Sequence, residues 1–110
     1  MNPDVTAYEV EVHDEAAHGM EILHMLDRRD RLADAESALS AGDRLALRSA
    51  DAELIQRARG FQAALGDWAD LQSERHARAI SPTRWWWYLD VIASIPGQLG
   101  RPDVASSVRA

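Results

Sequence analysis

The 110-residue sequence contains no cysteine and no lysine, so every basic side chain other than histidine is an arginine. Without cysteine there is no disulfide, thiolate metal site or cysteine nucleophile. The chain also has no apolar run near the roughly 18 residues that a membrane-spanning helix needs, and no early apolar run after a basic N-terminus. We therefore expect a cytoplasmic protein without a membrane span.

Motifs for catalysis are also missing. No glycine-rich loop offers a phosphate site, and no serine lies in a nucleophile-elbow sequence. We therefore predict a non-enzymatic protein without a cofactor. An all-α enzyme whose acidic residues bind magnesium is an open alternative, but no acidic motif is complete enough to name its residues.

Charge is distributed unevenly along the chain. The net charge is −6, but residues 1 to 43 carry −8 and residues 44 to 110 carry +2. The first 27 residues contain seven acidic side chains and no arginine. An acidic segment repels nucleic acid and attracts a basic protein surface, so we expect no direct nucleic-acid binding and a protein partner with a basic surface.

The most regular stretch runs from residue 43 to residue 80. Mostly apolar side chains recur there every seven residues, with a second set four positions after them: Leu47, Leu54, Phe61 and Trp68, then Ala58, Leu65, Gln72 and Ala79. Gly60 and Gly66 lie outside this seam, so we expect one continuous helix through both glycines, at about 1 kcal/mol each. A seam this narrow predicts a partner helix.

The segment before it reads as the first arm of a helical hairpin. Asn2 and Pro3 are typical of a helix start, and an apolar face continues to about residue 28. Alternating β-branched residues from 4 to 12 also fit a strand, which stays open. A change of apolar phase predicts a kink near residue 29, and Gly42 and Asp43 fit a C-cap followed by an N-cap.

Antiparallel pairing of the two arms has two consequences that the structure can test. It brings Arg75 and Arg78 near acidic residues at the start of the first arm, namely Asp4, Glu9 and Glu11. It also places Trp68 against Ala16 and Gly19, which leave room for an indole ring.

Three tryptophans and a tyrosine follow in succession. Ser81 and Pro82 predict the start of a helix that runs to about residue 95, where Pro96 and Gly97 end it. Its aromatic residues point in different directions around an α-helix, so at least one is left over from the core. Because tryptophan is common at interface hot spots, we predict a partner or dimer surface there, formed by Trp85, Trp86, Trp87 and Tyr88.

Two Glu-x-x-His spacings in the first arm suggest a second kind of site. Such pairs ligate metal in carboxylate-bridged helical bundles, and one chain would need to dimerise to supply enough ligands: Glu15, His18, Glu21 and His24. These side chains lie away from the apolar stripe on a helical wheel, which favours a solvated acidic face with incidental histidines.

Together these features predict an all-α fold: a long antiparallel helical hairpin with a kinked first arm, and a short tryptophan-rich helix. We expect one helical domain over residues 1–97, a loose tail over 98–110, and a homodimeric helical bundle. The predicted function is that of an adaptor, accessory subunit or inhibitor. Its expected contact residues are the four aromatic residues and acidic residues of the first arm: Glu9, Glu11, Asp14 and Glu21. A metal-binding dimeric four-helix bundle is the alternative.

Overall fold

The computed structural model describes residues 2–95. In this part of the chain the elements are α1 (Pro3–Val12), α2 (Gly19–Ala35), the 3-10 helix η1 (Glu36–Ala38), α3 (Ala41–Gln56), α4 (Ala58–Leu65), α5 (Leu71–Arg78), the 3-10 helix η2 (Trp85–Tyr88) and α6 (Leu89–Ala93). None of the described residues forms a strand, so the all-α fold is confirmed, and residues 4–12 are helical.

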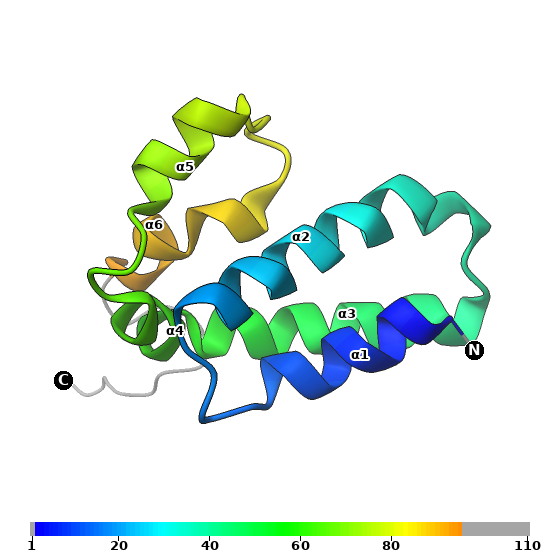
Figure 1. Cartoon of the computed structure of the whole chain (residues 1–110). Helices are drawn as coiled ribbons and strands as arrows, with labels where there is room; N and C mark the ends of the chain where they lie inside the picture. The colour runs from blue at the N-terminus through cyan, green and yellow to red at the C-terminus, as the bar shows by residue number, and fades with distance from the viewer. Residues whose placement is uncertain (1, 96–110) are drawn as a thin grey trace, which may run out of the picture.

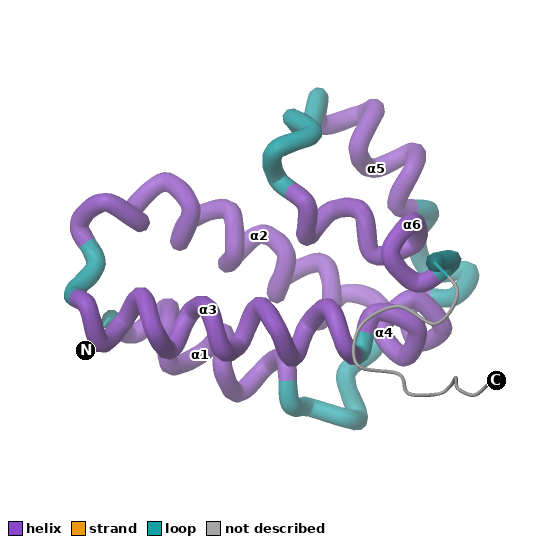
Figure 2. The backbone as a smooth tube through the Cα atoms, turned by 180° about the vertical axis from the view of Figure 1, so that it is seen from behind, coloured by secondary structure: helices purple, strands orange, loops and turns teal. Residues whose placement is uncertain are grey.

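The helices form two connected groups. Helices α1, α2 and α3 lie lengthwise and pack together, with α1 contacting both of the others (Figure 1). Helices α4 and α6 pack against each other at one end, and α5 stands apart from the long helices, where it contacts η2 (Figure 2). The segment after α4 therefore folds back over the side of α2.

Buried apolar side chains come from both groups. The fully enclosed ones include Val5, Tyr8, Val12, Ile22, Leu26, Leu32, Leu54, Leu65, Leu71, Trp87 and Leu89. Members of the predicted seam from α3 and α4 lie in this core, so one chain covers most of the seam without a partner helix.

Helix α1 begins as expected and ends early. The Asn2 side chain accepts hydrogen bonds from the N–H groups of Asp4 and Val5, at 2.8 and 3.3 Å, and Pro3 occupies the first helical position. The helix ends at Val12, not near residue 28. The intervening turn is closed locally, because the Asp14 carboxylate accepts from the Ala16 N–H at 2.9 Å.

The kink predicted near residue 29 is wrong, since α2 runs unbroken from Gly19 to Ala35. The change of apolar phase has another cause. Two faces of α2 are covered, one by the long helices and the other by the segment after α5. Arg29 donates hydrogen bonds to Asp51 of α3, whereas the next residue, Asp30, accepts hydrogen bonds from residues of η2.

The single long helix over residues 43–80 is also wrong. Gly60 continues a helix, as expected, but Gly66 ends α4 with φ +51° and ψ −131°, a backbone conformation that L side chains rarely adopt. The chain resumes at α5, where Asp70 caps the helix by accepting from the Gln72 N–H at 3.2 Å. The hairpin's second arm is therefore three helices.

The turn between α2 and α3 uses different residues from those predicted. Ser40, and not Asp43, caps α3, with its Oγ accepting from the Asp43 N–H at 3.0 Å. Gly42 lies inside the first turn of α3 instead of ending the preceding helix. The Asp43 carboxylate accepts from the Asn2 N–H at 3.1 Å, which ties the N-terminus to α3.

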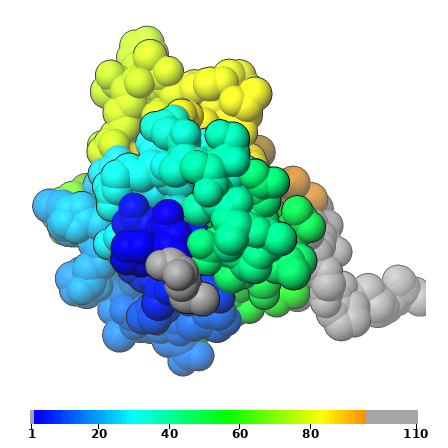
Figure 3. Space-filling view, turned by 90° about the vertical axis from the view of Figure 1, so that its right-hand side faces the viewer, coloured from blue at the N-terminus to red at the C-terminus, as the bar shows by residue number. Residues whose placement is uncertain are grey.

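Arg75 and Arg78 do not pair with the predicted acidic residues at the start of the first arm. Arg75 pairs with Asp90 at 2.7 Å, and Arg78 pairs with Asp27 at 2.7 Å. Residues near 80 accordingly lie above the C-terminal half of α2 when the molecule is seen from the N-terminal end (Figure 3). The acidic residues of α1 take a nearer partner, because Arg28 contacts both Asp4 and Glu11.

The predicted tryptophan-rich α-helix is a turn at residues 81–84 followed by the 3-10 helix η2 and then the short α6. The stop predicted at Pro96 and Gly97 and the loose tail from residue 98 to 110 lie outside the described residues.

Candidate functional site

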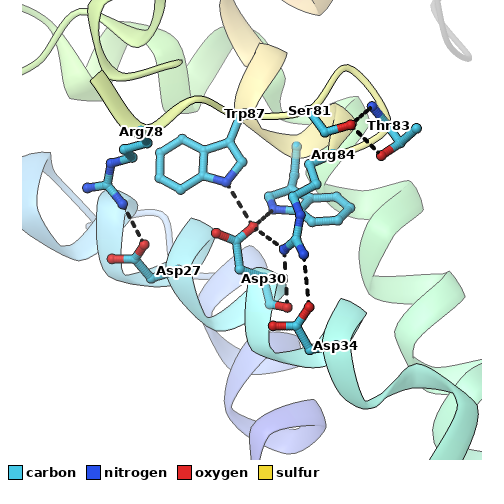
Figure 4. Close-up of polar contacts among 9 residues, drawn as sticks. Asp27, Asp30, Asp34, Arg78, Ser81, Thr83, Arg84 and Trp87 are labelled. Carbon is cyan, nitrogen blue, oxygen red and sulfur yellow. Dashed lines mark hydrogen bonds and ion pairs between the residues drawn. The ribbon is translucent and has the colours of Figure 1, made fainter. Parts of the chain in front are cut away.

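The four aromatic residues predicted to bind a partner lie mostly inside the molecule. Trp86 and Trp87 are 3% and 0% exposed, and Trp85 and Tyr88 are half-buried. The indole N–H groups of Trp86 and Trp87 both donate to Asp30 Oδ1, at 2.8 and 2.9 Å (Figure 4). Trp86 and Trp87 therefore belong to the hydrophobic core. Of the four aromatic residues, a partner can reach only parts of Trp85 and Tyr88.

Arginine side chains cover the aromatic rings. The guanidinium carbon of Arg29 lies 4.2 Å from the ring centroid of Trp86, and Arg78 lies 4.6 Å from that of Trp87. Arg75 covers Tyr88 in the same way at 4.4 Å. Such cation–π contacts add to the burial of the rings, so the cluster holds the segment after α5 in place.

Three aspartates on α2 anchor the same segment. Asp27 pairs with Arg78 at 2.7 Å, and Asp34 pairs with Arg84 at 2.9 Å (Figure 4). Asp30 lies between them and adds a 3.1 Å contact with Arg84 to its two indole bonds. No sequence pattern indicates this role for Asp30, because its partners are more than fifty residues away along the chain.

The acidic contact residues predicted on the first arm are separated by the turn after α1. Glu9 is half-buried, and Glu11 pairs with Arg28 at 3.0 Å. Asp14 and Glu21 are exposed near the turn, and Glu21 accepts from the His18 N–H at 3.2 Å. Asp14 and Glu21 are therefore the two of these acids that a partner can reach freely.

Two of the four alternative metal ligands, His18 and Glu21, lie near each other, but the described residues do not assemble the set into a metal site. Glu15 pairs with Arg57 at 3.2 Å, while His18 lies 3.8 Å from Glu21 next to its own helix start. Within residues 2–95, no three histidine, aspartate or glutamate side chains lie close enough together to hold a metal ion.

Trp68 is the exposed tryptophan that the partner prediction left out. It follows α4, and 55% of its surface is exposed. Its indole rests on Gly19: a Cβ atom built there would lie 2.4 Å from Trp68 Cγ. The predicted contact between Trp68 and Gly19 is confirmed, but the ring covers the start of α2 from outside and does not enter a buried seam.

Exposed apolar and acidic residues flank this indole in the chain. Met20, next to Gly19, is 45% exposed. Three exposed acids lie within two residues of Met20 or Trp68 in sequence: Glu21, Asp67 and Asp70. We call these five residues the Trp68 patch: Trp68, Met20, Glu21, Asp67 and Asp70. An apolar centre with acidic neighbours is suited to contact with a protein that carries both apolar and basic side chains.

A small pocket lies beside the patch, between the turn after α1 and helix α4. Its volume is about 130 Å³. The same two segments of the chain build the pocket and the Trp68 patch, because Ala17 and Ala64 line the pocket and precede Gly19 and Trp68 by two and four residues.

Comparison of the chain with protein-family models, curated proteins and solved structures gave no match. Among the described residues, no helix combines the length and the apolar character needed to cross a membrane. The fold therefore defines the class as an all-α helical protein.

Proposed function

We propose that this protein is a small, non-enzymatic interaction module, an adaptor, accessory subunit or inhibitor, that binds a protein partner with a basic surface through the Trp68 patch. The observation that carries the proposal is the indole of Trp68, which is 55% exposed yet held against Gly19. A ring already fixed in position loses little conformational entropy on binding, and tryptophan is among the residues that dominate binding energy at interfaces.

The exposed acidic residues also favour a protein partner with a basic surface. Glu21, Asp67 and Asp70 lie within two residues of Met20 or Trp68 in sequence, and Asp14 is exposed in the turn before α2. No arginine lies among residues 1–27, so this part of the molecule attracts a basic surface. The proposal moves the apolar anchor from Trp85–Tyr88 to Trp68, because the core takes up Trp86 and Trp87. It keeps the acidic contribution of the first arm.

Two further expectations stay predictions: the homodimer and the cytoplasmic location. The proposal depends on neither of them. The metal-binding bundle has no support among the described residues, because Glu15 pairs with Arg57 and no three candidate ligands lie together.

Selection of peptides from a random phage-displayed library against the full chain tests the proposal. We expect selected peptides to combine basic residues with an apolar anchor. Trp68→Ala should weaken their binding by about tenfold or more, because it removes the central ring of the contact. Isothermal titration calorimetry with the selected peptides measures the change.

Leu45 provides a matched control, because it is 64% exposed on α3 and lies outside the patch. Leu45→Ala should leave peptide affinity unchanged, while Asp67→Asn should weaken binding and reduce its salt dependence. Peptide binding that survives Trp68→Ala, or a library that yields no binder, would show that the Trp68 patch is not an interaction surface.

A further inference from the structure

The pocket beside the Trp68 patch has an apolar floor. Phe61, 5% exposed, and the methyl groups of Ala17 and Ala64 line it. These side chains offer no hydrogen bond, so the floor suits a methylene chain better than a polar group.

Two carboxylate side chains also line this pocket. Asp14 and Glu15 line it, and the Glu15 side chain is 86% exposed. The carboxylate of Asp14 accepts from the Ala16 N–H at 2.9 Å, and none of the described residues supplies a cation within ion-pair distance of it. The pocket therefore presents an unneutralised negative charge beside an apolar floor.

Arg57 also lines the pocket, but its guanidinium is already engaged. It donates to the Val12 carbonyl oxygen at 2.9 Å and pairs with Glu15 at 3.2 Å and Glu53 at 3.4 Å. Two of its three acceptors are carboxylates, which offset the charge of the guanidinium within the chain. An anionic ligand would be repelled by these carboxylates, whereas a cationic ligand meets the carboxylate of Asp14 directly.

Gly60 keeps the pocket open. It lies inside α4, where alanine would favour the helix more than glycine does. A Cβ built on Gly60 would meet no atom within 4 Å, so neither crowding nor an unusual backbone requires glycine at this position. A side chain placed there would instead extend from the wall of the pocket.

We propose that this pocket receives a lysine side chain of the protein partner, with its methylene chain on Phe61 and its ammonium group at Asp14. This assignment rests on the proposed function, because the pocket adjoins the Trp68 patch. It gives the basic partner a defined anchor: a lysine next to the residue that contacts Trp68.

The probe for the test is n-butylammonium, which reproduces the side chain of lysine. When it is titrated into the ¹⁵N-labelled full chain, the chemical shifts of amide resonances around the pocket, including those of Gly60 and Ala64, should change. These changes should saturate at millimolar concentrations of n-butylammonium. Ammonium chloride at equal ionic strength and n-butyrate, which would seek Arg57, should not cause them. Equal or tighter binding of n-butyrate would overturn the assignment.

Gly60→Leu blocks the pocket without removing any contact of the folded chain. We expect it to abolish the response to n-butylammonium and to leave the thermal midpoint unchanged or higher, which separates blockage from unfolding. Gly42→Leu is the matched control, because Gly42 is also an exposed helical glycine and its nearest neighbour would be Ser40 Oγ at 3.9 Å. It should retain the response. A saturable response that persists in Gly60→Leu contradicts the proposal.

The selected peptides distinguish the two proposals. If Trp68→Ala abolishes peptide binding while Gly60→Leu and lysine-to-norleucine peptides bind as tightly as before, the pocket assignment fails and the interaction surface stands. If n-butylammonium binds but Trp68→Ala leaves peptide affinity unchanged, the pocket is a cation site and the proposed function fails. Loss of peptide affinity in both variants supports both.

Discussion

Arg29 joins three helices through one buried guanidinium. Its Nε and Nη2 donate to the two carboxylate oxygens of Asp51, at 2.9 and 3.0 Å, and the Tyr8 hydroxyl donates to Asp51 Oδ1 at 2.7 Å. Arg29 is 5% exposed and also stacks on Trp86. A buried charge network of this kind fixes the position of α1, α2 and α3 relative to one another, but it also makes the fold sensitive to the loss of one member.

Asp51→Leu leaves the Arg29 charge buried without its partner. We expect the free energy of unfolding to fall by about 3–5 kcal/mol in urea titrations followed by circular dichroism. Replacing the whole network, as Tyr8→Phe, Arg29→Met and Asp51→Leu together, should restore most of this loss, because apolar side chains of similar size need no partner. Equal destabilisation of the single and triple variants would show that the network itself supplies the stability.

At the scale of elements, Asp30 determines how η2 is held. A single carboxylate oxygen accepts from both indoles, and Asp30 also contacts Arg84. Neighbouring Asp34 makes one ion pair and its side chain is 71% exposed. The two aspartates lie one turn apart on α2, but Asp30 makes more contacts with the segment after α5 than Asp34 does.

Asp30→Ala leaves two buried indole N–H groups without an acceptor. We expect it to lower the free energy of unfolding by about 2–4 kcal/mol, whereas Asp34→Ala should cost less than about 1 kcal/mol because it breaks one exposed ion pair. Urea unfolding followed by tryptophan fluorescence compares them. Similar values for both variants would mean that the indole bonds do not hold η2.

Helix boundaries differ in how well the sequence predicts them. The predicted start of α1 is confirmed, because Asn2 caps the helix and Pro3 begins it within a single turn. The seam correctly selected Leu54, Phe61 and Leu65 as core residues, since periodicity reports which face is buried. It did not reveal the end of α4, because a glycine outside the seam fits both a continuing helix, as at Gly60, and a reversal, as at Gly66.

At the scale of the whole molecule, the network around Tyr8 links stability to alkaline pH. Burial, and then the negative charge of Asp51, raise the pKa of the Tyr8 hydroxyl well above its ordinary value of 10.0. The folded protein therefore holds this proton more tightly than the unfolded chain does. The resulting stability is present in full below about pH 10 and is lost as the pH rises above it.

We expect the free energy of unfolding to decline above about pH 10, by up to about 1.4 kcal/mol per pH unit. Lysine side chains ordinarily titrate in the same pH range, but this chain contains none, so they do not contribute to the decline. Urea titrations at a series of alkaline pH values measure the slope, which Tyr8→Phe should flatten. An unchanged slope in Tyr8→Phe would assign the decline to another group.

The homodimer expected from the narrow seam remains a prediction at this scale. The reason for expecting it has weakened, because Leu54, Phe61 and Leu65 are covered within one chain. Light scattering of the purified protein over a concentration series measures the oligomeric state directly.

Features that arise within a few turns of chain follow from the amino-acid sequence alone: the helical class, the capped start of α1, and the buried face of α3 and α4. Caps and periodicity predict these because they depend on near neighbours. Which tryptophan is exposed depends on the packing of the helices. Trp86 and Trp87 are buried because they reach Asp30, 56 and 57 residues away, and Trp68 stays outside because Gly66 ends α4 just before it. Contacts over such distances follow from how the helices pack.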